Sequence, residues 1–112
     1  MKIVKDVIIR EELHRMASER FGNLVKAVVD LGKEILAVDA ELHSDLEALL
    51  LEFGSKQKDL WGVNFYPELQ GEEFLEFDSM INVRPSQGNR TRGVEDAATR
   101  AKIAGIVAKR VR

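Results

Sequence analysis

The segment from Ile81 to Asp96, INVRPSQGNRTRGVED, concentrates hydrogen-bond donors in one loop. Each of its arginines offers five N–H donors in a planar fork, a geometry that matches a phosphate or a carboxylate. Amide and hydroxyl side chains add further donors, and Gly88 and Gly93 allow backbone N–H groups to turn towards a common centre. We therefore predict an anion-binding site within residues 84–93, formed by Arg84, Ser86, Gln87, Asn89, Arg90 and Arg92.

The same loop leads into the N-terminus of a helix, where unpaired N–H groups and the helix dipole favour an anion. It contains neither GxxxxGK followed by Ser or Thr nor GxGxxG, so a nucleotide-binding motif of either type is excluded. A competing interpretation is structural. In it, the arginines hold the loop in place by bonding to its own carbonyls and to the acidic middle of the chain, or lie in solvent.

A second group of polar residues lies in ELHSDLE, where His43 is surrounded by acidic side chains. In a strand or in a helix, the histidine shares a face with a carboxylate, which can orient an imidazole as a general base. A divalent metal is an alternative, but no second histidine stands nearby. A solvated polar turn is the simplest interpretation. We name His43 as a candidate catalytic residue and predict no metal site and no cofactor.

Four polar residues interrupt apolar strand patterns: Asn64 in WGVNFYP, and Asp78, Ser79 and Asn82 in FDSMINVRP. An unpaired buried polar group costs about 1–3 kcal/mol, so each must be exposed, paired or functional. Asn64 and Asn82 can face each other across a hairpin, with Arg84 on the same strand face as Asn82. We predict that both asparagines bind the ligand and that Asp78 acts as a counter-ion or proton acceptor. A purely structural cross-strand ladder fits equally well.

Two helices and several strands must position these residues. Lys2 to Ile9 has the composition of a short strand. EELHRMASERFG places Leu13, Met16, Ala17 and Phe21 on one helical face, with Gly22 as a helix stop. From residue 23 to residue 84, short apolar runs alternate with turn residues, which is typical of an antiparallel meander. In LWGVNFYP, alternate residues point to opposite faces, as in a strand.

The last segment, Val94 to Val111, predicts an amphipathic helix with alanines along one line, a face that lets a helix approach a sheet or another helix closely. The sequence therefore predicts an α+β fold in a single domain, residues 1–112. It has a mainly antiparallel sheet of about five or six strands, with an N-terminal helix and a C-terminal helix packed on it.

One stretch is ambiguous. The leucines of residues 42–53 fit a helix at i, i+4, i+7 and i+8, with Ser44 as a cap, but they also fit a strand that follows a turn at HSD. We favour the strand. The choice decides whether His43 lies on a strand or at the beginning of a helix.

Composition excludes several function classes. With 112 residues and no cysteine, the chain has no disulfide, no thiolate metal site and no cysteine nucleophile. Charged residues interrupt the apolar N-terminal stretch, so it is neither a signal-peptide core nor a membrane span. We expect a cytoplasmic protein that does not bind membranes.

The net charge of −2 is unevenly distributed: residues 1–33 carry +2, residues 34–83 carry −10 and residues 84–112 carry +6. Such a chain can pair its charges internally, pair head-to-tail with a copy, or present a positive patch to an anion. Nucleic-acid-binding domains usually have a clear basic excess. We therefore expect that nucleic acid is not a partner.

The stretches DLWGVNFYPE, EFDSMINVRPSQGNRTRGVED, ERFGNLVKAVVD and AELHSDLEALLLEFGSKQ resemble a small family of uncharacterised prokaryotic proteins that share a conserved domain of unknown function. The resemblance extends from about Glu12 to Lys109, and its most specific part is the arginine-rich loop. It implies a stand-alone cytoplasmic protein of bacteria or archaea. It supplies no activity and no site residue.

Three functions remain in competition. The first is a binding module or small enzyme for an anionic small molecule. The second is an interaction protein, such as a homodimer, that uses the basic loop and the C-terminal helix. The third is a ribonuclease of the compact toxin type, which the acidic middle of the chain disfavours. Whether the protein is an enzyme stays open at this point.

Overall fold

The protein forms an antiparallel five-stranded sheet with the strand order β1-β3-β2-β4-β5 and three α-helices, in a computed structural model that describes all 112 residues. This confirms the predicted α+β fold. The strands are β1 Lys2–Val4, β2 Val25–Asp30, β3 Ile35–Val38, β4 Leu60–Phe65 and β5 Leu75–Glu76, and the helices are α1 Arg10–Glu19, α2 His43–Glu52 and α3 Ala97–Arg110.

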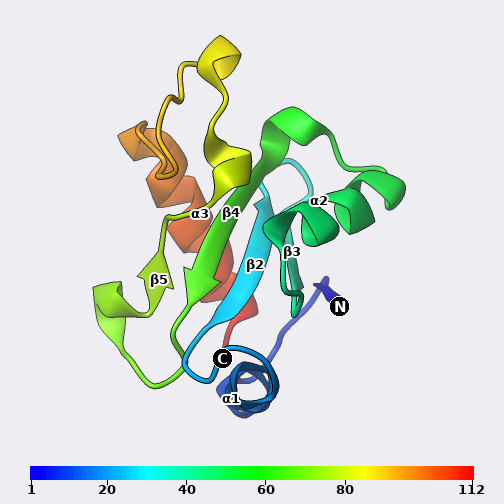
Figure 1. Cartoon of the computed structure of the whole chain (residues 1–112), viewed down its shortest axis with the longest axis vertical. Helices are drawn as coiled ribbons and strands as arrows, with labels where there is room; N and C mark the ends of the chain where they lie inside the picture. Colours follow the sequence, from blue (N-terminus) through cyan, green and yellow to red (C-terminus); the bar gives the residue numbers. More distant parts are fainter.

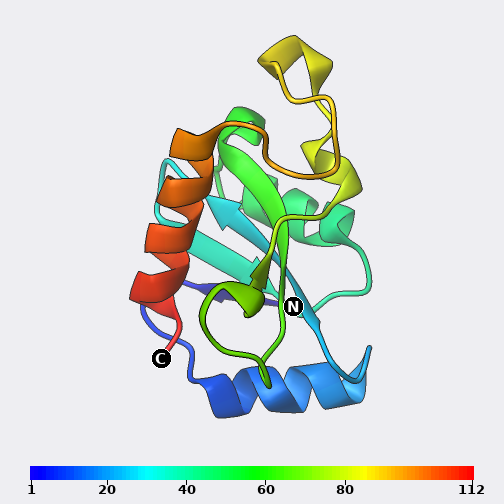
Figure 2. The same cartoon turned by 90° about the vertical axis from the view of Figure 1, so that its left-hand side faces the viewer.

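The helices cover both faces of the sheet (Figures 1 and 2). Alternation along β4 creates the two layers: Trp61, Val63 and Phe65 belong to the larger core, which includes apolar residues of α1 and α3. Leu60 lies on the other side, in a smaller core with Leu46 and Leu50 of α2. The polar Asn64 falls on the α2 side of β4.

The first helix agrees with its predicted apolar face except at Phe21, which lies beyond the end of α1 and is 42% exposed. Leu13, Met16 and Ala17 of α1 are buried. The backbone N–H of Gly22 donates to the carbonyl of Ala17 at 2.6 Å, and Gly22 has a φ of +90°. A left-handed residue that returns a hydrogen bond into the last turn is a common helix stop, and glycine adopts it without strain.

The strand that we favoured for residues 42–53 is wrong, because His43–Glu52 is the helix α2. Leu46 and Leu50 lie one helical turn apart and are fully buried against the second face of the sheet. If this segment were an edge strand, that second face would be exposed to water. The simple meander is also wrong. The connection through α2 carries the chain past β3, so that β4 pairs with β2.

The predicted final strand is mostly absent. Only Leu75–Glu76 pairs with β4, and a short 3-10 helix, Met80–Asn82, follows. Ser79 caps this turn by accepting a hydrogen bond from the N–H of Ile81 at 3.2 Å. Asn64 therefore lies opposite Glu76, and the predicted cross-strand pairing of Asn64 with Asn82 is wrong.

The alanine face of α3 does not pack against the sheet. Ile103, Ile106 and Val107 are the buried residues of this helix, whereas Ala104 and Ala108 are exposed. The larger apolar side chains take the core, because burial of each removes more apolar surface from water than burial of an alanine. The expectation that the small residues provide a close packing face inside the protein is thus wrong.

Part of the uneven charge is neutralised within the chain. Three of the six salt bridges join the acidic middle to the flanking basic segments: Arg20–Asp39, Arg92–Asp78 and Lys109–Glu34. Exposed ion pairs contribute little to stability, so this neutralisation adds little to the free energy of unfolding. None of the helices has the length and apolar character that crossing a membrane requires.

Candidate functional site

The guanidinium of Arg84 donates its hydrogen bonds to backbone carbonyls of the same chain. Its Nη1 donates to the carbonyl of Gln57 at 2.7 Å, its Nη2 donates to the carbonyl of Leu60, and its guanidinium lies 4.3 Å from the centre of the Trp61 ring. Burial lowers the pKa of Arg84 from its ordinary value. The side chain therefore holds the loop against the start of β4, as the competing interpretation of the loop expects for this arginine.

Asn82 and Asn89 form a connected pair below the loop. Asn82 accepts from the N–H of Gly62 at 2.8 Å and donates to the carbonyls of Gly62 and Arg92, both at 2.9 Å. Asn89 donates to three carbonyls, including that of Asn82 at 2.8 Å, and accepts from the N–H of Glu95. Both amides are buried and satisfied, so each serves as a tie between backbone segments.

The other predicted donors point in different directions. Ser86, Gln87 and Arg90 are exposed on the loop, which projects from one end of the molecule (Figure 2). Arg92 donates its Nε to Asp78 at 2.7 Å, whereas Arg84 contacts Gln57, Leu60 and Trp61. The structure does not bring the three guanidinium groups to one centre.

A different cluster brings together four predicted residues, His43, Asn64, Asp78 and Arg92. Asn64 donates to Glu76 at 2.9 Å and to the carbonyl of Asp78 at 3.3 Å. The cluster also includes residues that the sequence did not single out. Paired positions on β2, β4 and β5 place Lys26, Asn64 and Glu76 in one row on the α2 side of the sheet.

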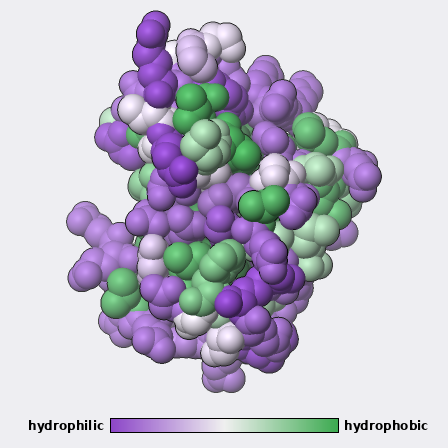
Figure 3. Space-filling view, viewed as in Figure 1, coloured by the Kyte–Doolittle hydropathy of each residue, from purple (hydrophilic) through white to green (hydrophobic).

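Tyr66 completes this row at the end of β4. Its hydroxyl donates to Glu76 at 2.9 Å, and burial, followed by the bond to Glu76, raises its pKa above the ordinary value. The strand register places Lys26 and Glu76 on either side of Asn64. The sequence could not identify these two residues as site residues, because the register is known only after the strands are paired. Figure 3 views this side of the molecule, where hydrophilic residues lie between separate hydrophobic patches.

His43 is the first residue of α2 and is 7% exposed. Its Nε2 lies 2.8 Å from the carbonyl oxygen of Val63. Because a carbonyl can only accept, Nε2 carries the hydrogen and Nδ1 of the neutral ring keeps its lone pair. Burial is the largest cause that lowers the pKa of His43, and the charge of Lys26 lowers it further. The imidazole is therefore a neutral hydrogen-bond acceptor at neutral pH.

The lowered pKa of His43 predicts a pH-dependent stability. The folded protein binds fewer protons at His43 than the unfolded chain does, so the free energy of unfolding should fall as the pH drops below about 6.5. Urea unfolding from about pH 8 to about pH 5 measures this fall, which His43→Gln should reduce. His14→Gln, at an exposed histidine of α1, is the matched control. An unchanged fall in His43→Gln would contradict the assignment.

A small hollow, the α2 pocket, opens where these elements meet. It has a volume of about 230 Å³ and lies between the N-terminus of α2, the 3-10 helix Met80–Asn82, Lys26 and Arg92. The N-cap of α2 is Leu42, which has no side-chain acceptor for the first N–H groups of the helix. Among the residues that line the pocket are Lys26, His43, Ser44, Ser79, Met80 and Arg92.

The charges around the α2 pocket favour an anion. Lys26 and Arg92 are cationic, and the beginning of α2 carries the positive end of the helix dipole. Asp78 occupies one donor of Arg92 and leaves its other N–H groups available. No group of three or more His, Asp or Glu side chains is placed to hold a metal ion.

Comparisons with known proteins add a family. No curated protein matches the chain, and no solved structure matches it. A family model described as a protein of unknown function, DUF5674, matches residues 2–110. Since the match covers nearly the whole sequence, the chain belongs to the DUF5674 family.

Proposed function

We propose that the protein binds a small molecule that carries a phosphate or carboxylate group, and that the anionic group lies in the α2 pocket. The single observation that carries this proposal is the arrangement of Lys26 and Arg92 around the uncapped N-terminus of α2. The anionic ligand is the one expected from the sequence. The proposed binding site, however, is the pocket between Arg92 and the N-terminus of α2, and not the tip of the loop.

The chemistry of the pocket supports an oxyanion. Unpaired N–H groups at a helix N-terminus bind phosphate or carboxylate without any further motif. Two cationic side chains add attraction from separate elements, β2 and the loop. The hollow is also smaller than the 300–1,000 Å³ typical of drug-sized ligands, so it suits one anionic group with the rest of the ligand outside.

Neighbouring uncharged groups add hydrogen-bonding partners to the site. Ser44 offers a hydroxyl at the rim, and His43 offers an acceptor in a neutral ring. Asn64 has a buried Oδ1 without a hydrogen-bond partner, close to His43. A ligand with a hydroxyl beside its anionic group would give His43 a proton to accept, and this is the form in which the proposal includes acid–base chemistry.

A phosphate titration followed by amide chemical shifts tests the proposed site. Inorganic phosphate at millimolar concentration, compared with chloride at equal ionic strength, should shift the amides of residues 42–45. Arg92→Gln and Lys26→Gln should each weaken phosphate binding about 3- to 10-fold, because each removes a charged donor. Acetate in a parallel titration distinguishes a carboxylate from a phosphate preference.

Arg90→Gln is the matched control, since Arg90 is an exposed arginine of the same loop that does not line the α2 pocket. Its phosphate affinity should stay within about twofold of the wild type. Equal losses in Arg90→Gln and Arg92→Gln would return the site to the loop tip. Amides of residues 42–45 that do not respond to phosphate or acetate would exclude the α2 pocket.

A further inference from the structure

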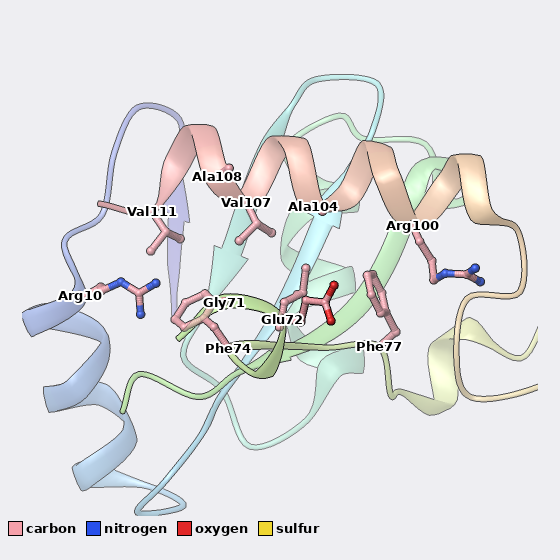
Figure 4. A pocket seen from close by; sticks show the side chains of 11 residues that line it. Arg10, Gly71, Glu72, Phe74, Phe77, Arg100, Ala104, Val107, Ala108 and Val111 are labelled. Atoms are coloured by element: carbon pink, nitrogen blue, oxygen red, sulfur yellow. The ribbon is translucent and has the colours of Figure 1, made fainter. Parts of the chain in front are cut away.

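A second hollow lies on the opposite side of the sheet, between α3 and the segment from Gly71 to Phe77 (Figure 4). This α3 groove has a volume of about 760 Å³, within the range of small-molecule sites. Its lining is mostly apolar and includes Arg10, Phe74, Phe77, Arg100, Ala104 and Val107. It is separate from the α2 pocket, so the inference below is independent of the proposed function.

Two alanines in the α3 wall leave room for the groove. Ala104 and Ala108 are exposed there, although larger residues at these positions would fill the space with the protein's own side chains. The opposite wall is fixed, since Phe74 is buried and its ring stacks on that of Phe65 with centroids 5.2 Å apart. Figure 4 shows Val107 and Phe74 facing each other across the groove.

An arginine stands at each end of the groove (Figure 4). The guanidinium of Arg10 lies 4.1 Å from the centre of the Phe74 ring, and Arg100 donates Nη1 to the carbonyls of Val94 and Glu95. Neither arginine belongs to any of the six salt bridges. Each keeps N–H donors that no carboxylate of the protein uses.

The spacing of the two ends limits the ligand. Arg100 and Val111 line opposite ends and are eleven positions apart on or just after α3, which corresponds to about 16 Å at the rise of an α-helix. Glu72 lies between the two arginines and is exposed, so it disfavours a negative charge in the middle of the groove. The occupant should be apolar along its body and anionic at one end.

We propose that the α3 groove binds an amphipathic carboxylic acid, with its apolar body on Phe74, Val107 and the exposed alanines and its carboxylate at one of the two arginines. The apolar walls supply affinity through burial of the chain. The guanidinium groups supply selection for the acid, because a guanidinium pairs with a carboxylate through two parallel hydrogen bonds. A neutral or cationic ligand of equal length lacks this second contribution.

Calorimetric titration of the full-length protein with matched ligands, each below its aggregation concentration, tests the proposal. Decanoate should bind at least tenfold more tightly than decanol or decyltrimethylammonium, which differ in the charge of the head group. The double variant Arg10→Gln/Arg100→Gln should lose at least tenfold in decanoate affinity and change decanol affinity less than twofold. Equal affinity for all three ligands would overturn the role of the arginines.

Filling the groove provides the second test. Ala104→Phe should abolish decanoate binding, because it places a ring in the groove from an exposed helix position where folding is preserved. Ala101→Phe is the matched control, since Ala101 is exposed on the same helix but does not line the groove. Urea unfolding checks that both variants fold. Retained decanoate binding in Ala104→Phe would overturn the site.

The other possible occupant is a second copy of the chain, and sedimentation velocity separates the two. The proposal expects an association state that Ala104→Phe leaves unchanged. A wild-type dimer that Ala104→Phe dissociates, together with no decanoate binding, would assign the groove to a protein interface and overturn the proposal.

Discussion

Replacing Asn82 by alanine should lower the free energy of unfolding by about 3–5 kcal/mol. Asn82 is fully buried, and its amide makes three hydrogen bonds to backbone groups of Gly62 and Arg92. Alanine leaves the N–H and the carbonyl of Gly62 without this partner, whereas the carbonyl of Arg92 keeps a hydrogen bond from the N–H of Ser79 at 2.9 Å. Each unsatisfied buried group costs about 1–3 kcal/mol. Some relaxation should keep the loss below the full sum.

Urea unfolding measures this loss, which should appear as a lower midpoint with an unchanged slope. Asn82→Asp tests the mechanism, because it retains an acceptor for the N–H of Gly62 but places a carboxylate oxygen where two carbonyls need a donor. Its loss should therefore equal or exceed that of Asn82→Ala. Ser86→Ala, on the exposed part of the loop, is the control. A loss below about 1 kcal/mol in both Asn82 variants would contradict this structural role.

The same side chain connects stability to the candidate site. Asn82 bonds to the carbonyl of Arg92, and the side chain of Arg92 turns from there towards Asp78 and the α2 pocket. Asn89 in turn bonds to the carbonyl of Asn82 and to the N–H of Glu95. The two amides thus fix the path of the loop, and the direction of Arg92 follows from that path.

Periodicity was enough to predict the α+β class and two of the helices. Leu13, Met16 and Ala17 repeat at helical spacing and are buried in α1, and Trp61 and Val63 alternate along β4 so that both lie in the larger core. These sequence patterns match the structure because each segment packs one side against the same large core. A pattern that is set by a single core is visible without knowledge of the partner segment.

Periodicity was not enough where tertiary contacts decide the backbone. The leucines of α2 fit both helix and strand, and only the uncovered second face of the sheet selects the helix. Near Asn82, an apolar run resembles a strand, but the Asn82 side chain bonds the backbone of Gly62 where a neighbouring strand would pair. Side-chain bonding of this kind competes with the sheet ladder and leaves no local signal.

The residues predicted for the candidate site were also partly right and partly wrong. Residue chemistry selected His43, Asn64, Asp78 and Arg92, which the fold brings together. It also selected Arg84, whose donors are used by backbone carbonyls. Donor chemistry alone cannot separate an arginine that ties a loop from one that lines a pocket, because both uses require the same N–H groups. Lys26 was missed because a lysine at a strand position is usually a solvent-facing residue.

Gly62→Ala should destabilise the protein by about 3 kcal/mol through a steric clash. A β-carbon at Gly62 would lie 2.5 Å from both the Cβ and the Oγ of Ser79, and 3.1 Å from a side-chain carbon of Ile81. Gly62 is a strand residue whose φ is not positive, so alanine causes no backbone strain there. The expected loss comes from forcing the 3-10 helix away from β4, which also stretches the bonds from Asn82 to Gly62.

The double variant Gly62→Ala/Ser79→Gly tests this explanation. Ser79→Gly removes both atoms nearest to the new methyl group, at the cost of the cap that Ser79 gives to the N–H of Ile81. If the clash is the cause, the double variant should lose about 2 kcal/mol less unfolding free energy than the sum of the losses of the two single variants, measured by urea unfolding. Strict additivity of the two losses would show that Ser79 does not meet the methyl group. The close packing of the 3-10 helix on Gly62 would then not explain why this strand position holds a glycine.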